Sequence, residues 1–134
     1  MTAPTGARRA DVELRLPADN AFVSVLRTAA AGLAARLDFT LDEIEDLKMA
    51  VGEASAIVLA GAADGSDLAS EFHLGDGELT VVVGVGADAA AAPDADSFAW
   101  QVLTTLADEA SARVDGGRFE ITLSVRSELR GSTD

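Results

Sequence analysis

Hydrophobic and polar residues alternate along residues 11–16, where Val12, Leu14 and Leu16 fall on one face. This period of two predicts a β-strand. Apolar residues then recur at three- and four-residue spacing, which predicts a helix over residues 20–37. The apolar positions of this helix are Phe22, Val25, Leu26, Ala29 and Leu33.

A second predicted helix has a defined start. Thr40 is followed three residues later by Glu43, the spacing of a capping box. The helix continues to about Ala60, and Gly61 and Gly65 then break the pattern. Its apolar face is formed by Ile44, Leu47, Val51, Ala54 and Val58.

Two short apolar stretches follow, separated by a glycine-rich turn. Residues 68–74 alternate, residues 75–77 read Gly-Asp-Gly, and residues 79–85 are rich in valine. This arrangement predicts a β-hairpin. Residues 86–96, rich in Ala and Asp, are expected to form a mobile loop.

The last third of the chain predicts a helix and another hairpin. The helix covers residues 97–109, and the hairpin joins residues 110–114 to 119–125 through the Asp-Gly-Gly turn at 115–117. The apolar positions of the helix are Phe98, Val102, Leu103 and Leu106.

The predicted order is strand, helix, helix, hairpin, loop, helix, hairpin. Helices that gather against a mainly antiparallel sheet form a two-layer α+β sandwich. We therefore expect one domain over residues 11–126, a flexible arm at 1–10 and a disordered tail at 127–134.

Composition narrows the possible function classes. The 134 residues are 49% hydrophobic and 25% charged, values typical of a globular domain with one core. The absence of cysteine and the single histidine, His73, argue against a metal site. The chain has no apolar run long enough to cross a membrane and no secretory signal near its start. A cytoplasmic protein that does not bind membranes is expected.

The charge balance is strongly acidic. The 10 Lys and Arg residues stand against 23 Asp and Glu residues, for a formal net charge of −13. Such a surface repels phosphate backbones, so binding to nucleic acid is not expected. Acidity can attract a basic protein partner, or it can serve solubility alone.

Three stretches, taken in order, resemble a known family. They are Val-Leu-Arg at 25–27, Leu-Lys-Met-Ala-Val-Gly-Glu-Ala at 47–54, and the run at 97–109. Over residues 12–126 the chain resembles the RsbW and SpoIIAB anti-sigma factors of the GHKL ATPase superfamily. The third stretch is most similar to actinobacterial anti-sigma-F proteins of the UsfX type. The resemblance implies the histidine-kinase-like (Bergerat-type) ATPase fold.

Relatives in this family include serine kinases, so each nucleotide-binding motif has to be compared. The family's N-box has Glu-x-x-x-Asn on a helix, in which Asn holds Mg²⁺ and Glu activates the attacking hydroxyl. This chain has Glu53, but Ile57 stands at the Asn position and offers no oxygen to the ion. Glu53 is either a relic of the catalytic base or an ordinary acidic residue of a solvated helix face.

The two remaining family motifs are also altered. In the Asp-x-Gly-x-Gly motif, Val82 replaces the Asp that binds adenine, while Gly84 and Gly86 are kept. These glycines would either cradle a ligand or simply form a turn. In the Gly-x-Gly that opens the last helix, Ser97 and Ala99 replace the glycines. Efficient ATP hydrolysis or phosphotransfer is therefore not expected, and neither is an ATP or Mg²⁺ cofactor.

Other residues carry two interpretations each. Arg27 matches an arginine with which SpoIIAB-like proteins contact the sigma factor; alternatively, it is an ordinary exposed helix arginine, with or without a neighbouring acid as its partner. Phe98 and Trp100 belong to the core or fill the emptied nucleotide pocket. His73 is interpreted as structural or solvent-facing.

The resemblance implies a binding protein that sequesters an alternative sigma factor of the sigma-F or sigma-B type, acts as a homodimer and is released by a STAS-domain anti-anti-sigma factor. One alternative is an active serine kinase of the RsbW type that phosphorylates its antagonist. Another is a regulatory pseudo-ATPase that binds antagonists but no sigma factor.

Overall fold

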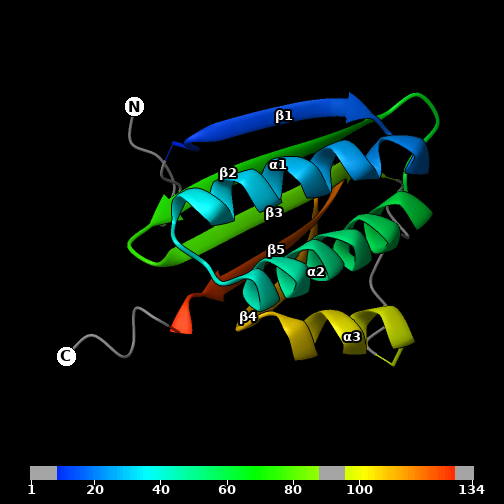
Figure 1. The fold of residues 1–134 in the computed structure, drawn as a ribbon. Helices are drawn as coiled ribbons and strands as arrows, with labels where there is room; N and C mark the ends of the chain where they lie inside the picture. The colour runs from blue at the N-terminus through cyan, green and yellow to red at the C-terminus, as the bar shows by residue number, and fades with distance from the viewer. Residues whose placement is uncertain (1–8, 88–95, 129–134) are drawn as a thin grey trace.

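A computed structural model describes residues 9–87 and 96–128 of the chain (Figure 1). The bounds of its elements are β1 (Val12–Pro17), the 3₁₀ turn η1 (Asn20–Phe22), α1 (Val23–Arg36), α2 (Leu41–Ala60), β2 (Asp67–Gly75), β3 (Glu78–Gly86), α3 (Phe98–Leu106), β4 (Glu109–Asp115) and β5 (Arg118–Arg126). The arm, loop and tail expected at 1–10, 86–96 and 127–134 lie largely outside the described residues.

The strands form one sheet in the order β1-β2-β3-β5-β4, and every neighbouring pair is antiparallel. The three helices lie on one face of this sheet, with α2 between α1 and α3 (Figure 1). This is the two-layer α+β sandwich that the order of elements predicts. Among the described residues, no helix lies on the opposite face of the sheet (Figure 1).

The core lies between α2 and the middle of the sheet. Alternate residues of β3 and β5 point toward the helices and are fully buried, among them Val81, Val83 and Leu123. Burial of each such side chain contributes about 1.5–3 kcal/mol. The facing side chains of α2 are also fully buried: Leu47, Val51, Ala54 and Val58.

The apolar stripe predicted for the first helix was partly wrong. Phe22 and Val25 remain 36% and 45% exposed, whereas the residues that α1 buries are Val23, Leu26, Ala30 and Ala34. An alanine-rich helix has several small-residue faces, so residue spacing alone does not fix which face is buried. The neighbouring helix and sheet make that selection.

The last helix is shorter than predicted. It ends at Leu106, not at residue 109. The amide of Asp108 donates to the Ser124 carbonyl at 2.9 Å, and the Asp108 carboxylate accepts from the Arg126 amide at 2.6 Å. These cross-strand bonds draw the chain into β4, so strand pairing competes successfully with helix propensity.

The capping box of α2 is confirmed and also holds the end of β5. Glu43 donates its amide to the Thr40 hydroxyl at 3.1 Å, and its carboxylate accepts from the Thr40 amide at 2.7 Å. The same carboxylate accepts from the Glu128 amide at 2.6 Å and from the Ser127 hydroxyl at 3.4 Å. Glu43 therefore joins the start of α2 to the residues after β5.

Two opposing effects act on the Glu43 carboxyl group. Burial favours the neutral form, but hydrogen bonds from the amides of Glu128 and Thr40 and from the Thr40 and Ser127 hydroxyls favour the carboxylate. Together they lower the pKa of Glu43 below its ordinary value of 4.5. The carboxylate form is thus the one that the fold binds.

Replacing Glu43 by glutamine should lower the free energy of unfolding by about 1 kcal/mol, because an amide cannot accept all of these hydrogen bonds. Urea denaturation followed by circular dichroism measures the change. Glu45→Gln is the matched control on the same helix, since Glu45 makes only an exposed 3.4 Å pair with Lys48. Equal losses in both variants would contradict this role.

The difference in unfolding free energy between the wild type and Glu43→Gln should depend on pH in a defined direction. Since the folded pKa lies below the unfolded one, the stabilisation is fully present above 4.5 and is lost as pH falls through the lowered pKa. The gap in stability between the wild type and Glu43→Gln should therefore shrink between about pH 5 and pH 3. A constant gap across that range would contradict the assignment.

Candidate functional site

Arg27 lies on α1, on the side of that helix that meets α2. Arg27 is exposed and makes no hydrogen bond or ion pair with any residue that the structure describes. Its side chain instead lies against Gly52 of α2, where an added Cβ would come within 3.3 Å of Nη1. Arg27 is therefore an exposed helix arginine without an acidic partner among the described residues, and both interpretations, sigma-factor contact and ordinary surface arginine, stay open.

The two N-box positions lie on α2. Glu53 and Ile57 are four residues apart and so share one side of the helix. Glu53 is half-buried, and Ile57 packs against the hydrophobic core. An isoleucine packed in this way offers no ligand to a hard cation.

The start of α3 replaces glycine backbone with a side-chain cap. The hydroxyl of Ser97 accepts a hydrogen bond from the Trp100 amide at 3.1 Å, while Ala99 is half-buried. Ser97 thus occupies an amide that an anion would otherwise reach at a helix N-terminus. Trp100 packs against the core, whereas Phe98 is 80% exposed, so only Trp100 behaves as a core residue.

The third motif lies on the other side of the sheet. Val82, Gly84 and Gly86 alternate with the buried valines of β3 and face the side without helices. Val82 is paired with Glu71 of β2 and Thr122 of β5. The sheet therefore separates these three positions from Glu53 and Ile57, and the structure does not bring the motifs into one pocket.

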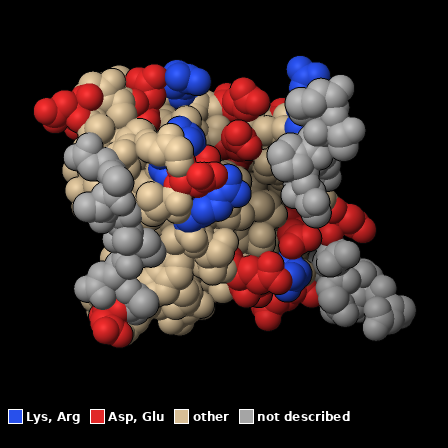
Figure 2. All heavy atoms as spheres, turned by 180° about the vertical axis from the view of Figure 1, so that it is seen from behind, with Lys and Arg blue, Asp and Glu red and all other residues tan. Residues whose placement is uncertain are grey.

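The open face is hollowed over β1, β2, β3 and β5, in an open cavity of about 580 Å³. Figure 2 shows interleaved basic and acidic side chains near the middle of this face. Its lining residues are Glu13, Leu14, Arg15, Ser66, Asp67, Ala69, Ser70, Glu71, Gly86, Arg118 and Glu120. Sequence reasoning missed this hollow, although the alternating charges at 13, 15, 118 and 120 were a readable signal.

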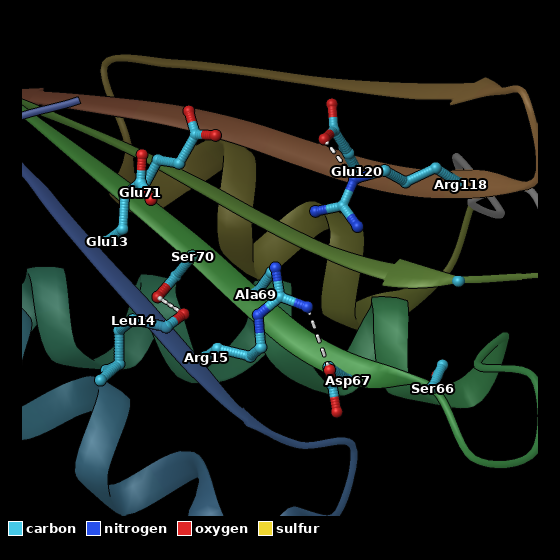
Figure 3. A pocket seen from close by; sticks show the side chains of 11 residues that line it. Glu13, Leu14, Arg15, Ser66, Asp67, Ala69, Ser70, Glu71, Arg118 and Glu120 are labelled. Atoms are coloured by element: carbon cyan, nitrogen blue, oxygen red, sulfur yellow. Dashed lines mark hydrogen bonds and ion pairs between the residues drawn. The ribbon is translucent and has the colours of Figure 1, made fainter. Parts of the chain in front are cut away.

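Both arginines of the hollow already have partners. Arg15 reaches Asp67 at 3.2 Å, and Arg118 reaches Glu120 at 2.7 Å (Figure 3). Glu13 stands directly opposite Glu71 in the strand register, an unfavourable juxtaposition of like charges. Four carboxylates against two paired guanidiniums favour a cation over a phosphate in this hollow.

Gly84 is needed because Arg118 occupies the space above it. An added Cβ would lie 2.6 Å from the Arg118 guanidinium and 2.9 Å from the Glu120 side chain. Glycine allows this close approach of a side chain to the backbone. The space over Gly84 is thus filled by this chain's own guanidinium.

The described residues do not fit ATP with Mg²⁺. Ile57 supplies no oxygen and Val82 supplies no acceptor for adenine. The Arg118 guanidinium lies over Gly84, and the hollow beside it has four carboxylates and two arginines. Within residues 9–87 and 96–128, no group of three or more His, Asp or Glu side chains is placed to hold a metal ion. Every helix in the same ranges is too short or too polar to traverse a lipid bilayer.

The chain is similar to curated serine-protein kinases named RsbW over about half of its length. No family model matches the chain. The serine-protein kinase RsbW of Halalkalibacterium halodurans is 40% identical over 73 residues, which cover 54% of this chain and 45% of that protein. The serine-protein kinases RsbW of Bacillus thuringiensis (strain Al Hakam) and Bacillus cereus (strain AH820) are 34% identical over 74 residues, or 54% of this chain and 46% of each.

The chain spans about half the length of the curated relatives it matches. Over that part, the resemblance to RsbW proteins is confirmed.

Substituting alanine for Gly84 should displace the Arg118 guanidinium, shift the Glu120 side chain and destabilise the protein by about 1 kcal/mol, because the ion pair between the two side chains would be disturbed. Gly75→Ala is the control, because a Cβ there meets its nearest neighbour at an ordinary 3.6 Å. In an Arg118→Ala background the cost of Gly84→Ala should fall by at least half. An undiminished cost in thermal or urea denaturation would refute the role of Arg118.

Proposed function

We propose, from the premise that the chain is RsbW-like over its matched half, that it is an anti-sigma factor. It would bind and sequester an alternative sigma factor and so repress transcription. The similarity to RsbW proteins is the observation that carries this proposal. The exposed and unpaired Arg27 supports it, because the residue that matches a sigma-contacting arginine is free to meet a partner.

The charge of the chain suits such a partner. A sigma factor must approach DNA and carries basic surfaces, and a protein with a formal charge of −13 attracts it over long range. Long-range attraction raises the rate of encounter, while short-range contacts such as that of Arg27 decide specificity. Binding should therefore weaken as salt concentration rises.

We also propose that the chain acts without phosphoryl transfer, as a pseudo-kinase. Ile57 and Val82 lack the oxygens that the family's Asn and Asp supply. Ser97 and Ala99 replace the glycines of the last motif, and the Ser97 hydroxyl already accepts from the Trp100 amide. Release of the sigma factor would then depend on competition by a STAS-domain anti-anti-sigma factor, in a partner-switching stress response within the cytoplasm. More specifically, we propose that the bound sigma factor is of the sigma-F type, as the similarity to UsfX-type anti-sigma-F proteins implies.

An active serine kinase is the second candidate. The relatives carry that name, and Glu53 stands half-buried on α2 at the position of the family's base. This candidate requires ATP and Mg²⁺ to bind in spite of Ile57. Incubation with ATP, Mg²⁺ and the cognate STAS-domain protein discriminates the two, because phosphoserine on the antagonist would establish the kinase.

The test of sigma binding uses the sigma factor that co-purifies with the tagged chain from its host. We expect Arg27→Ala to weaken binding about tenfold or more in calorimetry, as truncation of a central interface arginine does. Arg36→Ala, on the same helix and also exposed, should leave affinity unchanged. Affinity should be the same with and without ATP and Mg²⁺, and a nucleotide-dependent affinity would argue against the pseudo-kinase.

If only STAS-domain proteins co-purify, with no sigma factor, the anti-sigma proposal is wrong and the adaptor alternative replaces it.

We further propose a homodimer. Phe22, the last residue of η1, and Val25 of α1 are exposed apolar side chains, and together they form an apolar stripe at the start of the helix. Val25 lies about 160° around α1 from Arg27. Pairing of two copies through this stripe would bury it and leave Arg27 accessible. Exposed apolar side chains that lie together on one helix face are typical of interaction sites.

Val25→Glu should shift the mass measured by light scattering from dimer to monomer, because a charge would be buried at the interface. Leu41→Glu is the matched control, since Leu41 is 79% exposed at the start of α2 and outside the stripe. A wild-type chain that is monomeric at about millimolar concentration would contradict the homodimer.

A further inference from the structure

Neither the end of a helix nor the backbone conformation requires a glycine at position 52. Gly52 lies in the interior of α2, well away from both ends at Leu41 and Ala60. Its φ is not positive, because the glycines with positive φ are Gly65, Gly77, Gly116 and Gly117. The backbone therefore does not require glycine there, and alanine would favour the helix.

What Gly52 provides is space for Arg27. A Cβ at this position would meet Nη1 of Arg27 at 3.3 Å and its Cδ at 3.5 Å. The two atoms lie at the far end and the middle of the side chain, so a length of the arginine runs across the glycine. By contrast, a Cβ on Gly32 of α1 would meet nothing within 4 Å.

Packing alone sets the course of this side chain. Arg27 forms no hydrogen bond or ion pair among residues 9–87 and 96–128, so no polar partner fixes its guanidinium. Long charged side chains lie with their carbon stems against such surfaces and leave the charged end in water. The bare backbone of α2 at Gly52 is the surface that this stem follows.

We propose that Gly52 is a positioning residue for Arg27, allowing the arginine to lie across α2 at this point with its guanidinium presented to the sigma factor. The inference rests on the proposed anti-sigma function. A side chain that already lies in its bound position loses less freedom on binding, which is worth about two- to tenfold in affinity. A Cβ at position 52 would require Arg27 to give way slightly, and a longer side chain would occupy the path of the arginine.

The experiment measures affinity for the co-purified sigma factor in the full-length chain. Gly52→Leu should weaken binding about two- to tenfold, because the leucine side chain occupies the path of Arg27. Its melting temperature should equal or exceed that of the wild type, since leucine is a better helix former than glycine. Gly32→Leu makes the same change on α1 in open space and should leave affinity unchanged.

The double variant Arg27→Ala with Gly52→Leu separates positioning from direct obstruction. If Gly52 acts through Arg27, the double variant should bind no more weakly than Arg27→Ala alone. Additive losses would show that leucine blocks the partner directly and would overturn the inference. In wild-type protein without any partner, nuclear Overhauser contacts between Arg27 Hδ and Gly52 Hα should be present, and their absence would also overturn it.

The affinities of Gly52→Leu and Arg27→Ala together distinguish a wrong positioning role for Gly52 from a wrong anti-sigma function. Wild-type affinity in Gly52→Leu, together with a loss in Arg27→Ala, would remove the positioning role and leave the sigma contact in place. Unchanged affinity in Arg27→Ala would remove both.

Discussion

Burial of the apolar face of α2 against β3 and β5 is the interaction on which the rest of this structure depends. Val51 and Val58 of the helix and Val83 and Leu123 of the sheet are all fully buried, so the helix cannot shift without exposing both partners. Both ends of α2 are also secured. Glu43 binds the residues that follow β5, and the amide of Ala63 donates to the Gly86 carbonyl at 2.8 Å.

This central packing gives the molecule two chemically different faces. On the helix side, α1 and α3 pack beside α2, and Arg27 of α1 is exposed there without an acidic partner in the part of the chain that the structure describes. On the other side, no helix among residues 9–87 and 96–128 covers the sheet, and charged side chains lie among uncharged ones (Figure 2). Arg15 and Arg118 form ion pairs there with Asp67 and Glu120. A partner that meets the first face finds an available guanidinium, whereas one that meets the second finds arginines already held by carboxylates.

The sheet also separates the positions that match the family's nucleotide-binding motifs. In sequence, Glu53, Ile57 and the segment 82–86 look like successive parts of one site. In space, strand alternation turns Val82 and Gly84 to the open face, while Ile57 packs into the core on the helix side. The position over Gly84 is filled by Arg118, a residue more than thirty positions away that the motif does not contain. Chemistry that needs these positions together has no common pocket within the described residues.

The sequence by itself determined the order and type of the elements, because each follows from a local signal. The capping box at Thr40 set the start of α2, and glycine turns at 75–77 and 116–117 set the two hairpins. It also identified Arg27 as a candidate contact. Tertiary structure decided which face of the alanine-rich α1 is buried, where α3 gives way to β4, and that Arg27 lies on Gly52. These features depend on residues far apart in the chain, and periodicity within one element carries no information about the neighbour against which it packs.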